Sequence, residues 1–509
     1  MMADDEATTT ATPPENPAPP HSEPPQRQPP QRQWAVTASI LVTVAVLVVT
    51  ALLVTGQYVR SIHESRGFTV DPAPGLTVPT PAIVANPFDA PEPTKEAVAA
   101  ALAPYLSDPD LGSLAGHITD AITGTVLWTQ DPTTARVPAS STKILTAAAA
   151  LLALPHNTRV TTKVVRGEAP GEVILVGGGD VTLSAQPLGE STYYWDAPRL
   201  DDLVNQLETA GTEVTAVQVD SSAYDGPKMA REWLTQSIDD GFIAPIEPVM
   251  LDGGRLIATE PESPRSTEPA RAAAQTLASR LGLDAAAIEA VAEQTAAPDA
   301  EVLAEVASAP LLTRIRQFMV ESDNVLAEAV GREIAIAAGE TPSFRGTSRA
   351  IRSTLATNGL LTDGVTLEDA SGLSRRNQIS VAVIDSVIST SVGTVRSDEQ
   401  GRATVAPANA AVVVKLRPLL DTFPVAAGSG TLETRFDSDA STPGVGWVRA
   451  KTGTLDGVSA LAGYTVTRSE RILTFAFISS DSNAFASRPA LDALAAQLRT
   501  LDGDTDGEN

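Results

Sequence analysis

The chain has 509 residues and a formal net charge of −26, and this length is enough for more than one domain around a large core. No cluster of Lys or Arg occurs in it, which excludes nucleic acid as a partner because binding a phosphate backbone needs an array of cations. Cysteine is absent, so disulfides, thiolate metal sites and cysteine nucleophiles are excluded together.

The N-terminal part has the features of a membrane-anchored protein. Residues 1–33 are rich in Pro, Gln, Thr and acids, and we expect a disordered cytoplasmic arm. The uncharged run WAVTASILVTVAVLVVTALLV is long enough to cross a bilayer, so residues 34–55 are predicted to be a transmembrane helix. The alternative is a cleaved signal peptide, although no clear A-x-A site follows the run. Residues 56–94 are proline-rich and are predicted to form an extended spacer that holds an exported body away from the cell membrane.

The folded body is predicted to run from residue 95 to 501, before a solvated tail at 502–509. LAGHITDAITGTVLWTQ, which begins at Leu114, is expected to form two strands around a turn. The alanine- and leucine-rich segment 141–154 predicts a buried helix. Residues 268–307 are also rich in alanine, and we expect helices there as well.

The C-terminal part of the body predicts three successive strands and a final helix. The strands are expected in GWVRAKTGT, ALAGYTVT and RILTFAFISS, and the helix in FASRPALDALAAQLRTL. Because strands lie at both ends of the body with helices between them, we predict an α+β fold whose sheet is assembled from distant segments.

Three short motifs carry the chemistry, and each occurs once. They are Ser140-Ser141-Thr142-Lys143, Ser322-Asp323-Asn324 and Lys451-Thr452-Gly453. Residues three apart on a helix share a face, so the Lys143 amine can reach the Ser140 hydroxyl. Lys143 can act as a base only if burial, or a second cation such as Lys451, lowers its pKa. For this pair alone, the alternative interpretation is that Ser140 is a helix N-cap and Lys143 is a surface lysine.

Metal and cofactor chemistry has little support in the sequence. The histidines have no i, i+4 spacing, and neither H-E-x-x-H nor G-x-S-x-G occurs. We therefore predict no metal and no cofactor.

The three motifs in this order resemble those of the penicillin-recognising serine enzymes. More narrowly, PASSTKILT, LVGGGDVTLS, VDSSAYDGP, DASGLSRRNQIS and FPVAAGSGTLETRF are similar to stretches of the D-alanyl-D-alanine carboxypeptidase/endopeptidase family of class C, the penicillin-binding protein 4 type (peptidase family S13). The resemblance covers about residues 95–500. It implies a transpeptidase-like α+β fold, with an antiparallel sheet flanked by helices and an all-α lobe. This peptidase domain would comprise residues 95–164 and 311–501, with a domain inserted at 165–310.

The resemblance also implies the catalytic roles. Ser140 would attack the terminal D-Ala-D-Ala bond of a peptidoglycan stem peptide, and Lys143 would take its proton. Ser322 would pass a proton to the departing D-alanine with the help of Lys451. Asn324 would orient Lys143 and the substrate amide.

The remaining candidates would bind the substrate. Thr452, with Lys451, would hold the terminal carboxylate, and Gly453 would admit the substrate backbone beside its strand. The N–H of Thr454 would complete the oxyanion hole with that of Ser140. Asp220 is a candidate contact to the diamino acid of the stem peptide, although a structural turn is the favoured interpretation.

The predicted function is therefore a serine-type D-Ala-D-Ala carboxypeptidase that β-lactams inhibit covalently. Three alternatives remain: a peptidoglycan DD-endopeptidase, which shares every motif; a β-lactamase, for which no clear E-x-x-L-N segment occurs; and a non-catalytic β-lactam-sensing or wall-binding protein on the same fold.

Overall fold

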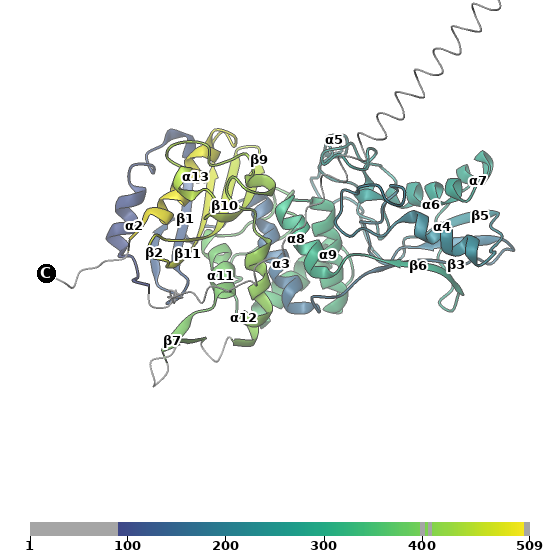
Figure 1. Cartoon of the computed structure of the whole chain (residues 1–509), viewed down its shortest axis with the longest axis horizontal. Helices are drawn as coiled ribbons and strands as arrows, with labels where there is room; N and C mark the ends of the chain where they lie inside the picture. Colours follow the sequence, from purple (N-terminus) through teal and green to yellow (C-terminus); the bar gives the residue numbers. More distant parts are fainter. Residues whose placement is uncertain (1–89, 398–402, 406–409, 503–509) are drawn as a thin grey trace, which may run out of the picture. The chain divides into compact units, whose positions relative to one another are not determined.

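The computed structural model describes residues 90–397, 403–405 and 410–502 (Figure 1). The predicted arm and anchor, together with most of the spacer and the tail, lie outside the described residues. Within these ranges no helix combines the length and the apolar character that a membrane crossing requires.

A five-stranded antiparallel sheet forms the first part of the body, in the order β2-β1-β11-β10-β9. Its strands are β1 (Ser113–Asp120), β2 (Val126–Gln130), β9 (Arg449–Leu455), β10 (Val458–Val466) and β11 (Ile472–Ser480). The first two come from the start of the body and the last three from its end. The predicted α+β fold, with a sheet assembled from distant segments, is confirmed.

Both faces of this sheet are buried, because successive side chains point to opposite sides. Phe475 and Phe477 pack in one cluster with side chains of α2 (Lys95–Leu102) and α13 (Ser487–Thr500). Ala476 belongs to a second cluster on the other face, with side chains of α11 (Val381–Val392). Figure 1 shows α13 and α2 beside the sheet.

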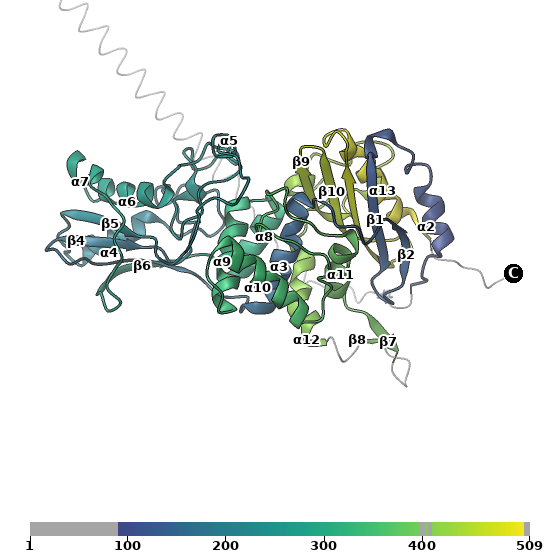
Figure 2. The same ribbon diagram turned by 180° about the vertical axis from the view of Figure 1, so that it is seen from behind.

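The largest hydrophobic cluster surrounds α3 (Thr142–Ala153), which confirms the helix predicted at 141–154. Every residue from Thr142 to Leu152 is buried. Figure 2 shows α3 running among the other helices of this lobe. These helices are α8 (Leu311–Val320), α9 (Asn324–Ala337), α10 (Phe344–Thr357), α11 and α12 (Ala410–Leu416).

A second sheet, in the order β5-β4-β3-β6, is formed by β3, which begins before residue 165, and by three strands from the segment 165–310. Its elements are β3 (Thr161–Arg166), β4 (Glu172–Val176), β5 (Ala216–Asp220), β6 (Val302–Ala307), α4 (Leu200–Thr209) and α6 (Pro269–Arg280). They share a hydrophobic cluster of their own. The strands begin at 161 and end at 307, and an inserted domain at 165–310 stays a prediction.

Short elements complete the described chain, namely α5 (Gln236–Asp239), α7 (Ala285–Glu289), β7 (Val395–Ser397) and β8 (Ala403–Val405). The expectation of helices throughout 268–307 is wrong at its C-terminal end, where β6 forms. Pairing with β3 overrides the helix propensity of alanine and glutamate there, since strand formation depends on the available partner.

Candidate active site

Ser140 lies in a tight turn that leads into α3. This 3-10 turn spans Ala139–Ser141, and Ala139 has a φ of 48°, in the left-handed region. The Ser141 hydroxyl donates to the carbonyl of Pro138 (2.6 Å) and the Thr142 hydroxyl to that of Ala139 (2.9 Å). These bonds hold the turn and leave Ser140 partly exposed at the mouth of a buried helix.

The Lys143 amine is fully buried and lies at the centre of the site. Its Nζ donates to the Ser140 Oγ (3.1 Å), the Asn324 Oδ1 (2.6 Å) and the Ser371 carbonyl (2.7 Å). An ammonium has three donors, so these contacts satisfy all of them. The geometry places a base candidate against a hydroxyl and fixes the direction of its side chain.

Burial lowers the pKa of Lys143 to about 8. Three carboxylates, those of Asp369, Asp323 and Glu328, act in the opposite direction and raise it. Burial prevails because a charged amine loses its hydration inside the protein. The lysine therefore has a neutral fraction near pH 7, as a general base requires.

The motif Ser322-Asp323-Asn324 forms the break between α8 and α9 rather than part of a continuous helix. Ser322 has a φ of 61°, and the Asp323 side chain caps α9 by accepting the Leu326 N–H (2.7 Å). The Asn324 Nδ2 donates to the carbonyl of Phe242 (2.9 Å), which leaves its Oδ1 for Lys143. The turn thus presents Ser322 and Asn324 to the site.

Asp323 is held by side chains of the inserted segment. Its Oδ2 accepts hydrogen bonds from the Arg255 Nη2 (2.9 Å) and the Tyr194 hydroxyl (3.1 Å). The Arg255 guanidinium also stacks over the Tyr193 ring, 3.5 Å from its centroid. Burial alone would raise the pKa of Asp323, but Arg255 and Arg265 hold it below its ordinary value. The motif is therefore positioned by a buried ion pair.

Lys451 contacts Ser322 and so links β9 to the α8–α9 break. It is buried on β9, and its Nζ donates to the Ser322 Oγ (2.9 Å) and the Thr452 carbonyl (2.9 Å). Burial, followed by the charges of Lys143 and Arg435, lowers the pKa of Lys451 well below its ordinary value. The described residues offer no carboxylate within ion-pair distance of this amine, so an anionic ligand would supply the missing charge.

The rest of this motif shapes the edge of the sheet. β9 is the last strand in the sheet order and therefore has a free edge, and it also packs against the nucleophile turn. A Cβ added at Gly453 would lie 2.8 Å from the carbonyl oxygen of Pro138, so a side chain there would push the turn away. The Thr452 hydroxyl donates to Thr431 (2.9 Å), and the Thr454 hydroxyl accepts from Arg488 (3.0 Å).

Eight of the nine predicted site residues therefore meet around the nucleophile turn, the α8–α9 break and β9. Asp220 does not join them. Its Oδ1 accepts the Ser222 N–H (2.8 Å) and its Oδ2 the Ala296 N–H (2.8 Å), beside a separate cavity of about 330 Å³. Both oxygens are thus engaged by backbone, in agreement with the turn interpretation.

Sequence reasoning missed several contacts of the site. The carbonyls of Ser371 and Phe242 carry no residue-type signal, because any residue supplies a carbonyl. Thr431 and Ser371 lie in the quoted stretches FPVAAGSGTLETRF and DASGLSRRNQIS, and the resemblance of these stretches was the available signal. Arg255 gave no signal in the sequence.

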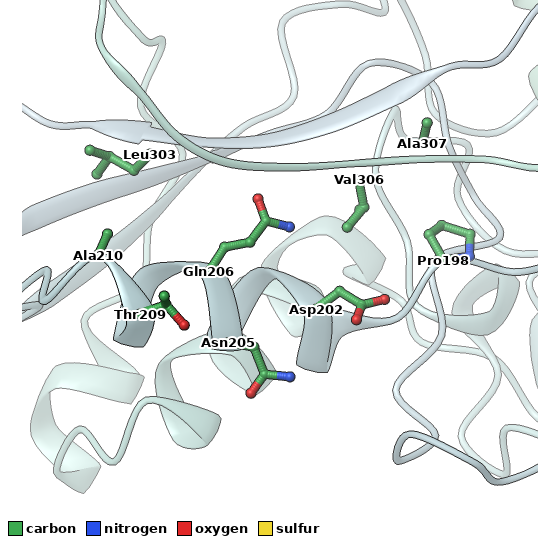
Figure 3. A pocket seen from close by; sticks show the side chains of 9 residues that line it. All are labelled: Pro198, Asp202, Asn205, Gln206, Thr209, Ala210, Leu303, Val306 and Ala307. Carbon is green, nitrogen blue, oxygen red and sulfur yellow. The ribbon is translucent and has the colours of Figure 1, made fainter.

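A groove of about 770 Å³ lies elsewhere, between α4 and β6, and contains none of the motif residues (Figure 3). Gln206 points from α4 toward β6 in this view. Its side-chain amide donates to the Glu305 carbonyl (3.0 Å) and accepts from the Glu305 N–H (3.0 Å). This pairing covers part of the free edge of the strand, which would otherwise offer unpaired backbone groups.

The sequence that forms this site matches the model of the D-Ala-D-Ala carboxypeptidase 3 (S13) family over residues 98–264 and 257–501. It belongs to this family. Carboxypeptidase DacB of Mycolicibacterium smegmatis is 44% identical over 468 residues, which cover 92% of this chain and 96% of that protein. A carboxypeptidase of Mycobacterium tuberculosis is 46% identical over 432 residues, 84% of this chain and 89% of that protein.

The fold is similar to that of penicillin-binding protein 4 of Haemophilus influenzae. The TM-score is 0.59 at 20% identity, covering 79% of this chain and 98% of the solved one. The same protein has also been solved in complex with a β-lactam, with a TM-score of 0.53 at 20% identity, covering 79% of this chain and 97% of that one. The S13 family member described here therefore has the fold of a penicillin-binding protein.

Proposed function

We propose that this S13 enzyme is a serine-type carboxypeptidase that removes the terminal D-alanine from peptidoglycan stem peptides through an acyl-enzyme on Ser140. One observation carries the proposal. The buried Lys143 amine, with a pKa lowered to about 8, lies 3.1 Å from the hydroxyl of Ser140. A hydroxyl is a weak nucleophile until a neutral base takes its proton, and this pair supplies both groups.

Acylation begins when Ser140 attacks the carbonyl of the penultimate D-alanine and Lys143 accepts the hydroxyl proton. Asn324 keeps the amine in place through its Oδ1. The backbone N–H groups of Ser140 and Thr454 stabilise the developing oxyanion. The new ester joins the Ser140 Oγ to the acyl group of the substrate.

The leaving group needs a proton on its nitrogen. Ser322 supplies it, and its hydroxyl is reprotonated from the neighbouring Lys451 amine, 2.9 Å away. D-alanine then departs as a neutral amine. The proton that Lys143 took from Ser140 passes to Lys451, so that both amines regain their starting protonation. Lys143 then takes a proton from the attacking water and returns it to the Ser140 oxygen as the ester breaks.

Substrate binding uses the free edge of β9. An extended peptide can align with this strand as an added neighbour, since Gly453 leaves room beside it. Lys451 and Thr452 take the terminal carboxylate, which supplies the anion that the buried amine lacks. A β-lactam fits the same site because its amide bond and carboxylate occupy the same positions, and we propose β-lactams as covalent inhibitors.

A fluorescent penicillin and a pentapeptide test this proposal together. Wild-type protein should become labelled and should release D-alanine from the pentapeptide. Ser140→Ala should do neither. Ser353→Ala is the matched control and should behave as wild type, since this hydroxyl donates to the Ala350 carbonyl within α10. A label that survives Ser140→Ala, or absence of label from wild type, would refute the mechanism.

The same experiment separates the alternatives. Rapid release of hydrolysed penicillin would indicate a β-lactamase. Cleavage of cross-linked dimers faster than pentapeptides would indicate an endopeptidase. Labelling without cleavage of either peptide would indicate a sensing or wall-binding protein.

We also propose that residues 34–55 anchor the enzyme in the cell membrane with the catalytic body outside. The support is the uncharged apolar run followed by a proline-rich spacer. The full chain should sediment with membranes and require detergent for release, whereas a chain lacking residues 1–55 should not. A mature N-terminus located after residue 55 would instead establish a cleaved signal peptide.

A further inference from the structure

Arg488, on the first turn of α13, reaches the end of the K-T-G strand. Its Nη2 donates to the Thr454 Oγ1 (3.0 Å), and its guanidinium lies over the Phe485 ring, 4.4 Å from the centroid. The bond to Thr454 holds the guanidinium beside the K-T-G strand, where its charge can attract an anionic group of the substrate.

The charges around Arg488 are not balanced. The neighbouring carboxylate, Asp492, already accepts two hydrogen bonds from Arg435, at 3.0 and 2.6 Å. In the part of the chain that the structure describes, no other carboxylate comes within ion-pair distance of Arg488 or of Lys451. Burial, followed by the charge of Arg435, lowers the pKa of Arg488. Lys451 and Arg488 therefore both lie at β9 without a carboxylate partner among the described residues.

The bond to Thr454 also orients that hydroxyl. When Arg488 donates to the Thr454 oxygen, the hydroxyl proton is left for another acceptor. Thr454 lies on the strand edge along which the substrate would align. A guanidinium and a hydroxyl that both donate form a suitable pair for a carboxylate.

We propose that Arg488 is a specificity residue for the terminal carboxylate of the substrate, acting together with Thr454 and Lys451. The proposal rests on the proposed carboxypeptidase function and deepens it. Arg488 favours peptides that carry a free carboxylate on the residue after the cleaved bond. It does so by direct attraction and by directing the Thr454 hydroxyl toward that carboxylate.

Two matched peptides test the proposal, one ending in D-Ala-D-Ala with a free carboxylate and the other with a carboxamide. Arg488→Met should lower kcat/KM for the carboxylate peptide about ten- to hundredfold, mainly through KM, as expected for loss of a charged hydrogen bond. For the carboxamide peptide the change should stay below about threefold, because the lost partner has no charge there. Arg488→Lys, which keeps the charge, should retain part of the preference.

Arg499→Met is the matched control, because Arg499 lies on the same helix and stacks on Trp447, 3.9 Å from the ring centroid. It should leave both kcat/KM values at the wild-type level. Equal losses on both peptides with Arg488→Met would show a purely structural role and overturn the proposal, as would no loss at all. If Arg488→Met does not fold, as judged by its thermal transition, Arg488→Gln and Arg488→Lys carry the same comparison.

Failure of the proposed function has a different signature. Wild type would then release no D-alanine from either peptide. Arg488 would be tested in that case by the rates of labelling with a penicillin and with its methyl ester. A slower reaction of Arg488→Met with the acid alone supports the specificity role, and equal slowing of both overturns it.

Discussion

At the scale of single residues, the protonation of Lys143 decides what Ser140 can do. With its ordinary pKa of 10.5, only about one lysine in three thousand would be neutral at pH 7. With a pKa of about 8, about one in ten is neutral. Three carboxylates keep the pKa from falling further, so the pKa of Lys143 stays within about one unit of neutral pH.

The pH dependence of acylation follows from this value. Lys143 must be neutral to accept the Ser140 proton, so kcat/KM should fall about tenfold for each pH unit below 8 and level off above it. Measurement of D-alanine release between pH 5 and pH 10 gives the profile. Lys143→Arg, which stays charged, should lose more than about a thousandfold.

Lys163→Arg on β3 provides the control, since this lysine lies on the second sheet and should leave the profile unchanged. A profile that is flat from pH 6 to pH 9, or an acid limb centred below pH 6, would contradict the assignment of Lys143 as the base.

At the scale of elements, the site depends on how closely the nucleophile turn approaches β9. The turn packs against the strand at Gly453, where even a Cβ would meet the Pro138 carbonyl and the Ala139 side chain. The helix break between α8 and α9 then places Ser322 beside Lys451. Each segment contributes one or two groups, and the distances between them depend on this packing.

Gly453→Ala should therefore impair catalysis by displacing the turn. Its Cβ would lie 2.8 Å from the Pro138 oxygen, so the backbone must shift. We expect a loss of about 1–3 kcal/mol in the free energy of unfolding, and penicillin labelling at least about tenfold slower. Gly428→Ala is the control, because its added methyl would meet Val425 at 3.4 Å. If Gly453→Ala is labelled at the wild-type rate, the close packing of the nucleophile turn against β9 is not needed for acylation.

At the scale of the whole described body, the inserted segment contributes to the catalytic motif. Arg255 pairs with Asp323, and both side chains are about 1% exposed. Phe242, from the same segment, accepts a hydrogen bond from Asn324. The segment 165–310 therefore supports the α8–α9 turn and contributes most of the second sheet.

Removal of one partner of the buried pair should affect both stability and acylation. Arg255→Met leaves the Asp323 carboxylate without its cation, and we expect a cost of about 3–5 kcal/mol in the free energy of unfolding, measured with urea. Labelling by penicillin should slow as the turn loses its position. The double variant Arg255→Met/Asp323→Asn should cost less than the sum of the two single changes.

Arg349→Met, which removes an exposed ion pair with Glu340, is the matched control and should unfold at the wild-type urea concentration. Additive costs in the double-mutant cycle would mean that Arg255 and Asp323 stabilise the protein independently.

The sequence by itself determined the chemistry and most local elements. Spacing on a helix places Lys143 beside Ser140, and the segments GWVRAKTGT, ALAGYTVT and RILTFAFISS predict β9, β10 and β11. Both depend on contacts between near neighbours in the chain, which residue patterns report directly. The resemblance added the roles of the three motifs and the expectation of an insertion.

The tertiary structure alone decided which distant groups meet. It brings Lys451 to Ser322, Arg255 to Asp323 and the Ser371 carbonyl to Lys143, and it leaves Asp220 bound to backbone. No local pattern encodes such contacts, because they depend on how separate segments pack and on backbone groups that every residue shares. The same packing buries Lys143, and burial is what turns an ordinary lysine into a candidate base for Ser140.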